Sequence, residues 1–126
     1  MSVAGVRRYA ARAGSTDLLG RVRVEARHHH LTIDGPPWND FPGEELMPGE
    51  AFLGGVAACA VELIQMFTRD DGIPVGDIDA DVVAELDPDD QPHPDHTLFN
   101  RVRMDVRVHG VDQATAERLV DRFKGR

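Results

Sequence analysis

Apolar and polar residues alternate along several segments of the chain, which is the pattern of strands with one buried face. The alternation is clear over residues 21–27 and 29–34, which form two strands or one bent strand, and it is weak over residues 6–10. It returns over residues 77–86 and 101–108, where the outward positions are mainly acidic in the first segment and mainly basic in the second. Antiparallel pairing would set these opposite charges against each other.

The segment between the two pairs of strands has the spacing of a helix. Six apolar side chains share one helical face: Phe52, Val56, Cys59, Leu63, Met66 and Phe67. Pro48 suits a first helical turn, and Gly72 followed by Pro74 ends the helix. We expect this long apolar helix to be buried at the centre of the fold. A shorter amphipathic helix is predicted from residue 112 or 113 to residue 124.

The connections suggest one α+β domain over residues 1–126. Residues 38–48 form a loop rich in proline and glycine, and the proline- and aspartate-rich residues 87–95 are too long for a tight hairpin and predict a mobile flap. The chain stops directly after the last predicted helix, although its set of strands looks incomplete. We therefore expect the C-terminal part of the fold to be missing.

Composition and charge exclude several classes of partner. The net charge is −8, whereas nucleic-acid binding needs a basic surface. No apolar run approaches the roughly 20 residues that span a bilayer, and the N-terminus lacks the apolar stretch of a secretory signal. A cytoplasmic protein with no nucleic-acid or membrane partner is expected.

The sequence contains one cysteine, Cys59, which excludes a disulfide within the chain and a cysteine-based zinc site. Such a residue is either a small core side chain or a reactive thiol. Three consecutive histidines, His28, His29 and His30, do not predict a metal site, because neighbours along a strand point to opposite faces. His93 and His96 are expected in a solvated loop.

Residues 48–59, Pro-Gly-Glu-Ala-Phe-Leu-Gly-Gly-Val-Ala-Ala-Cys, resemble the signature of the OsmC/Ohr family. In that signature a Pro and a Glu begin a helix that continues through small and apolar residues to the cysteine. The order of the predicted elements from Gly20 onward also matches the family. The resemblance implies an OsmC-like α+β fold, with antiparallel sheets around a long central helix and two chains interlaced as a homodimer.

The resemblance further implies a thiol-dependent reductase of organic hydroperoxides that acts in oxidative-stress defence. Cys59 then looks like the peroxidatic cysteine, and Glu50 like the carboxylate that orients an activating arginine, for which Arg12 and Arg27 are candidates. No metal or organic cofactor is expected, only an external dithiol reductant. The guanidinium would stabilise the thiolate, and a second thiol would resolve the sulfenic acid that peroxide attack produces.

Two departures from the family pattern bear on this reading. The peroxide-reducing branch usually has its Glu ten residues before the Cys, where this chain has Gly49, and Glu50 stands nine before. The second, resolving cysteine is absent unless the natural protein continues beyond Arg126 with one. Without it, an external thiol must reset Cys59.

Other interpretations remain open for the same residues. Glu50 can simply satisfy the helix dipole in the first turn. Trp38 and Phe41 either form an apolar lip over the thiol or pack a dimer interface. The alternative function is a non-catalytic OsmC-like dimer that binds a small apolar ligand, with Cys59 as a core residue. A third reading is a purely structural dimer.

Overall fold

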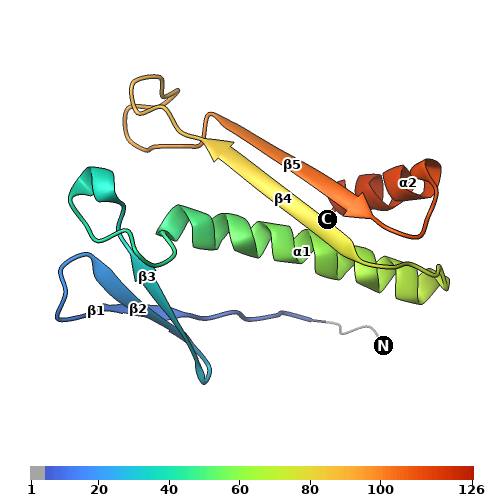
Figure 1. Ribbon diagram of the computed structural model, residues 1–126, viewed down its shortest axis with the longest axis horizontal. Helices are drawn as coiled ribbons and strands as arrows, with labels where there is room; N and C mark the ends of the chain where they lie inside the picture. Colours follow the sequence, from blue (N-terminus) through green and yellow to red (C-terminus); the bar gives the residue numbers. More distant parts are fainter. Residues whose placement is uncertain (1–4) are drawn as a thin grey trace. The chain divides into compact units, whose positions relative to one another are not determined.

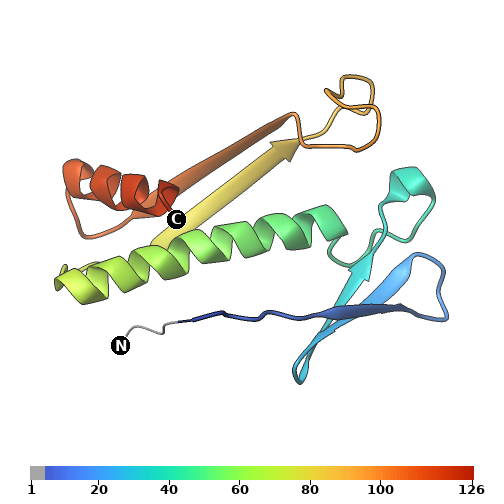
Figure 2. The ribbon, with the colours of Figure 1, turned by 180° about the vertical axis from the view of Figure 1, so that it is seen from behind.

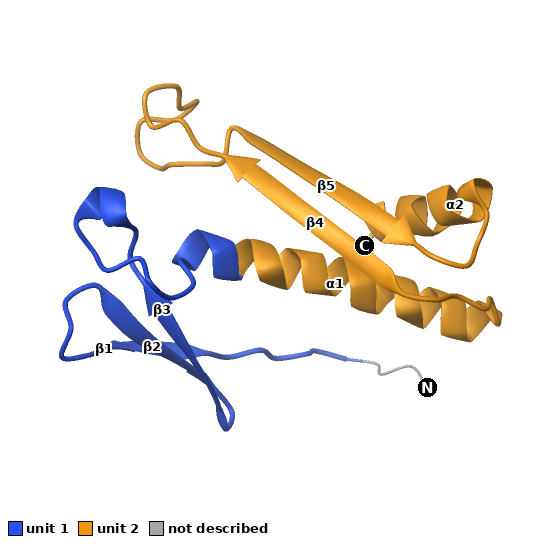
Figure 3. Cartoon of the chain, in the orientation of Figure 1, with its two compact units in different colours: residues 1–51 blue, residues 52–126 orange. Residues whose placement is uncertain are grey.

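The computed structural model describes residues 5–126, and the chain falls into two compact units, residues 1–51 and residues 52–126 (Figure 3). The first four residues, at the start of the N-terminal segment that lacks a signal-like stretch, lie outside the described residues. Each unit contains one antiparallel sheet (Figure 1). The predicted combination of helices and antiparallel strands is confirmed, and the single domain over residues 1–126 stays a prediction.

The first unit holds a three-stranded sheet in the order β1 (Arg12–Ser15), β2 (Arg21–Ala26) and β3 (His29–Asp34). The segment from residue 21 to residue 34 therefore forms two strands, joined by a two-residue turn at Arg27 and His28. The weak alternation over residues 6–10 does not form a strand, and β1 begins only at Arg12. Short, half-apolar segments form strands only where a neighbouring strand offers hydrogen-bond partners.

The loop after β3 is anchored by an aromatic ring. It contains the 3₁₀ helix η1 (Pro37–Asn39) and then Phe41, whose ring packs against the backbone at Gly20 and Gly35. A Cβ atom at either glycine would collide with that ring, and Gly20 also has a positive φ of 89°. Phe41 thus holds the loop on its own sheet, whereas the side chain of Trp38 is exposed.

Helix α1 (Pro48–Asp71) has the predicted bounds but a different buried face. Its buried residues are Ala60, Ile64, Phe67 and Thr68. The expectation that this helix is buried is not met by the described chain, in which Cys59 and Phe52 of the predicted face are exposed. The expectation that no apolar segment is long enough to span a bilayer is also wrong, because α1 meets that criterion by length and composition, as core helices of soluble proteins also do.

In the second unit, β4 (Ile78–Glu85) and β5 (Arg101–Val108) form an antiparallel pair alongside α1, and α2 (Gln113–Lys124) lies near the start of β4 (Figures 1 and 2). The core gathers at that end of the hairpin, around three buried side chains: Ile64, Phe67 and Leu119. Apolar residues from β4 and β5 pack against them, including Ile78 and Val108. The other end of the hairpin keeps apolar side chains exposed, among them Val102.

The outward face of this hairpin carries the expected charges. Asp79 lies opposite Arg107, and Glu85 lies opposite Arg101, which confirms the predicted pairing of an acidic strand with a basic one. Asp81 faces another aspartate, and the guanidinium of Arg107 reaches Asp81 diagonally at 2.7 Å. This contact offsets the repulsion between the two aspartates.

The connection between β4 and β5 has its own hydrogen-bond network. The side-chain amide of Gln91 donates to the Asp87 carbonyl at 2.7 Å, and its oxygen accepts from the Leu98 amide at 2.7 Å. Asn100 Oδ1 accepts from the Asp87 amide at 2.7 Å. The side chains of Gln91 and Asn100 therefore link the two ends of the connection that was expected to be a mobile flap.

Candidate functional site

Cys59 lies near the middle of α1, with its side chain exposed. Of the apolar positions predicted to share its helical face, Phe67 is buried, whereas Val56, Leu63 and Met66 are half-buried and the ring of Phe52 is 64% exposed. Phe52 stacks on Phe99, at the end of the β4–β5 connection, with ring centroids 6.4 Å apart. The thiol therefore lies in an apolar stripe that the described residues leave largely uncovered.

Glu50 lies in the first turn of α1 and closes that turn. Its Oε1 accepts a hydrogen bond from the backbone amide of Met47 at 2.8 Å, as the third-position glutamate of a capping box does. Nine residues separate it from Cys59, which in a regular helix is a rotation of about 180° and a rise of about 13.5 Å. Glu50 and Cys59 of one chain therefore point from opposite sides of the helix. The proposed role of Glu50 in orienting an arginine stays a prediction.

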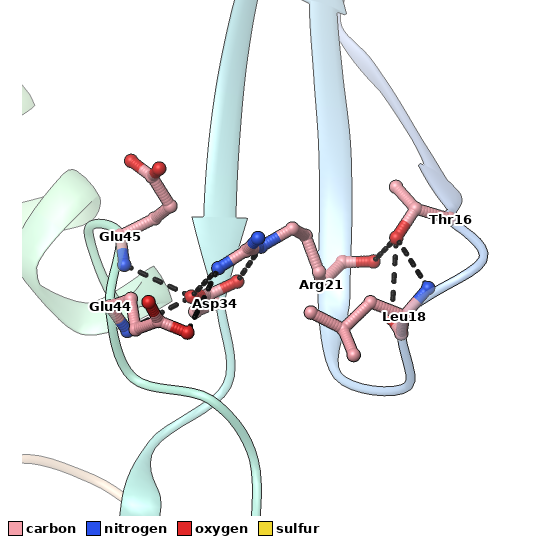
Figure 4. A network of polar contacts seen from close by, with 6 residues as sticks. All are labelled: Thr16, Leu18, Arg21, Asp34, Glu44 and Glu45. Carbon is pink, nitrogen blue, oxygen red and sulfur yellow. Dashed lines mark hydrogen bonds and ion pairs between the residues drawn. The ribbon is translucent and has the colours of Figure 1, made fainter.

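The most strongly held arginine is Arg21, which the sequence did not single out (Figure 4). Its Nε and Nη2 atoms donate to the two carboxylate oxygens of Asp34, at 2.7 and 2.8 Å. Arg21 and Asp34 are cross-strand partners at the ends of β2 and β3. The Asp34 side chain is fully buried, whereas that of Arg21 is 27% exposed. The guanidinium is thus fixed in a two-bond clamp while one side remains accessible.

Asp34 also organises the loop that leads into α1. Its Oδ2 accepts hydrogen bonds from the backbone amides of Glu44 and Glu45, at 2.9 and 3.0 Å (Figure 4). The hydrogen bond from Arg21 holds the pKa of Asp34 well below its usual range, against the effect of burial, and the two amides act in the same direction. The same hydrogen bond raises the pKa of Arg21. Both groups therefore stay charged at neutral pH.

This clamp predicts an acid-sensitive contribution to stability. Because the folded pKa of Asp34 is depressed, its contribution is complete above the unfolded value of about 3.9 and is lost as the pH falls below it. Asp34→Asn should lower Tm at pH 7, and the difference in Tm between the two proteins should shrink as the pH falls from about 5 to about 3. Thermal unfolding followed by circular dichroism at each pH measures this. A difference that stays constant over that range would contradict the assigned role.

The two arginines considered from sequence lie in the first unit, on either side of one shallow hollow. Arg12 Nη1 is 3.6 Å from the carboxylate of Glu25, its cross-strand partner, and its side chain is 75% exposed. Arg27 occupies the turn between β2 and β3 in a left-handed backbone conformation, with φ of 56°. Neither guanidinium is held as firmly as that of Arg21.

The histidines form no metal centre among residues 5–126, where no group of three or more His, Cys, Asp or Glu side chains is arranged to hold an ion. His30 accepts a hydrogen bond from Arg23 Nε at 3.2 Å. The rings of His93 and His96 stack with centroids 4.6 Å apart. These contacts involve protein groups alone.

The OsmC-like protein family matches residues 41–126 of this sequence, a span that includes Glu50 and Cys59. No curated protein matched the chain. Three solved structures illustrate the likeness of the fold. An OsmC-like protein from Mycoplasma pneumoniae superposes with a TM-score of 0.81 at 15% identity, over 95% of this chain and 82% of that one.

Two organic hydroperoxide resistance proteins share the same fold. The protein from Legionella pneumophila has a TM-score of 0.73 at 22% identity, over 97% of this chain and 85% of its own. The protein from Elizabethkingia anophelis, crystallised with thiocyanate, has a TM-score of 0.77 at 13% identity, over 98% and 85%. Two antiparallel sheets, one long helix and the match over residues 41–126 agree with the resemblance of residues 48–59. The chain therefore belongs to the OsmC-like protein family.

Proposed function

We propose that the protein is a thiol-dependent peroxidase that reduces organic hydroperoxides, with Cys59 as the reacting group. The observation that carries the proposal is an exposed thiol within an apolar stripe of α1, in a chain of the OsmC-like family. A thiol must be accessible to react, and apolar neighbours suit the organic part of a hydroperoxide. The two organic hydroperoxide resistance proteins of the same fold give additional support.

The proposed reaction consumes one hydroperoxide and one dithiol in each cycle. The Cys59 thiolate attacks the terminal peroxide oxygen, the O–O bond breaks, and the alkoxide takes up a proton to leave as an alcohol. Cys59 becomes a sulfenic acid. One thiol of an external dithiol then attacks the sulfur and releases water, and its second thiol displaces Cys59 from the mixed disulfide. The products are the alcohol, water and an oxidised dithiol, and no metal or organic cofactor takes part.

An activating arginine would stabilise the thiolate and the leaving alkoxide, and a charge held in place in advance does so without reorganisation. The orientation of that arginine by Glu50 is part of this proposal.

A stopped-flow experiment tests the proposed chemistry. The loss of free thiol is followed after cumene hydroperoxide is mixed with the protein, with Cys59→Ser as the blank and free cysteine as the reference. We expect Cys59 to react at least about 100-fold faster than free cysteine, as an activated thiol should. A rate equal to that of free cysteine would overturn the peroxidase proposal and favour a dimer that only binds a small apolar ligand.

We also propose that two copies of the chain associate in the cytoplasm. Only four of the 24 residues of α1 are buried, and large apolar side chains such as Phe52 and Val102 remain exposed. Exposed apolar surface of this kind is typical of protein interfaces.

Association through α1 predicts that one substitution separates the copies. Phe52→Glu should shift the protein from dimer to monomer in sedimentation velocity at micromolar concentration, because a charge would be buried without a partner. Val83→Glu makes the same change at a residue that is 62% exposed on the outward face of β4, and should leave the dimer intact. A monomeric wild-type protein, or an equal response of both variants, would contradict the interface.

A further inference from the structure

The hollow between Arg12 and Arg27 takes no part in the proposed thiol chemistry. It has a volume of about 270 Å³ and is lined by six residues: Ala10, Ala11, Arg12, Glu25, Ala26 and Arg27. Three of these are alanines, so the walls between the charged groups are apolar and closely spaced. A hollow of this size suits a small molecule with one charged end and a short apolar body.

Positive charge exceeds negative charge around this hollow. Glu25 is the carboxylate in its lining, and its oxygens are shared among Arg12 at 3.6 Å, Arg23 at 3.3 Å and His30 at 3.5 Å. The guanidinium of Arg27 has no ion pair or hydrogen bond assigned to it within residues 5–126. The lining of the hollow thus contains two guanidinium groups and one carboxylate, although the whole chain carries a net charge of −8. Such a local excess attracts anions.

The backbone at Arg27 gives a second, independent observation. Its φ of 56° lies in the left-handed region, where glycine or asparagine is the usual residue of a two-residue hairpin turn. The fold does not require an arginine there, since glycine would adopt the same conformation with less strain. The strained backbone at Arg27 therefore carries a long cationic side chain that lines the hollow.

We propose that this hollow binds a small organic oxyanion, a short-chain carboxylate or a phosphate monoester, between the guanidinium groups of Arg12 and Arg27. Planar guanidinium groups bind carboxylate and phosphate oxygens through paired hydrogen bonds. The alanines contact the short apolar part of the ligand. The carboxylate of Glu25 holds the guanidinium of Arg12 beside the hollow.

Calorimetric titration of the full chain with succinate, and separately with inorganic phosphate, tests the site at constant ionic strength. We expect one saturable site per chain for at least one of the two anions, and the stronger of them identifies the preferred oxyanion. Arg12→Gln and Arg27→Gly should each weaken that binding by about tenfold or more, the value of one lost charge-assisted contact. Arg103→Gln removes the same charge from an exposed β5 residue that pairs only with Asp105, and should leave binding unchanged.

Arg27→Gly separates binding from structure. If the site is real, this variant binds the anion less tightly while its Tm equals or exceeds that of the wild type, because glycine relieves the left-handed strain. The absence of saturable heat with both anions at millimolar concentration would overturn the proposal. Equal weakening by all three substitutions would overturn it as well, because it would show a general effect of net charge. Neither result depends on the reactivity of Cys59.

Discussion

Replacing Arg21 with glutamine is expected to lower the free energy of unfolding at pH 7 by about 3–5 kcal/mol, the usual effect of removing one partner of a buried ion pair. The reason is that the fully buried carboxylate of Asp34 loses the guanidinium that donates two hydrogen bonds to it. Urea denaturation followed by circular dichroism measures the effect.

The single substitution leaves a buried carboxylate without its partner, so a second variant is needed. Arg21→Gln combined with Asp34→Asn removes both charges and keeps an uncharged hydrogen-bonding pair, which should fold better than either single variant. The double variant should recover part of the lost free energy of unfolding. Arg103→Gln is the matched control, because it removes an exposed guanidinium of the second unit. If Arg21→Gln lowers the free energy of unfolding no more than Arg103→Gln does, the clamp does not stabilise the protein.

Replacing Phe67 with alanine is expected to lower the free energy of unfolding by about 3–5 kcal/mol, as is usual for a large aromatic side chain removed from a core. Phe67 is fully buried and forms the centre of the second unit with Ile64 and Leu119. The guanidinium of Arg122 lies 4.2 Å from the centre of its ring, so the substitution also removes a cation–π contact.

Urea denaturation followed by circular dichroism measures this loss. Gln65→Ala changes an exposed residue of the same helix and should alter the free energy of unfolding by less than about 0.5 kcal/mol. A loss below about 1 kcal/mol for Phe67→Ala would mean that the cluster of Ile64, Phe67 and Leu119 is not the core of this unit.

Sequence patterns predicted the elements better than they predicted which faces are covered. The period of α1 was correct, yet its buried face runs through Ala60, Ile64 and Phe67 instead of through Cys59. A helix that is apolar on more than one side does not indicate which side packs against the sheet. The weak alternation at residues 6–10 forms no strand, because alternation alone does not supply a neighbouring strand.

The candidate site was only partly accessible from sequence. Cys59 and Glu50 were found through the motif in residues 48–59, whereas Arg21 and Asp34 carried no motif and lie 13 positions apart. A signal did exist. Once the turn is placed at Arg27 and His28, the register of β2 and β3 sets Arg21 opposite Asp34. Without knowledge of the β2–β3 register, Arg21 and Asp34 each look like an ordinary surface charge at the end of a strand.

The packing of Phe41 against two glycines has a consequence for how this protein can vary. A side chain added at Gly20 or Gly35 would occupy the space that the ring fills, so neither glycine can change while residue 41 stays aromatic. Conversely, a smaller residue at position 41 would free space for a side chain at position 35, whereas the positive φ of Gly20 would still favour glycine there, and it would loosen the loop that carries Glu44 and Glu45 to Asp34. We therefore expect that a side chain larger than glycine at position 20 or 35 requires a smaller residue at position 41.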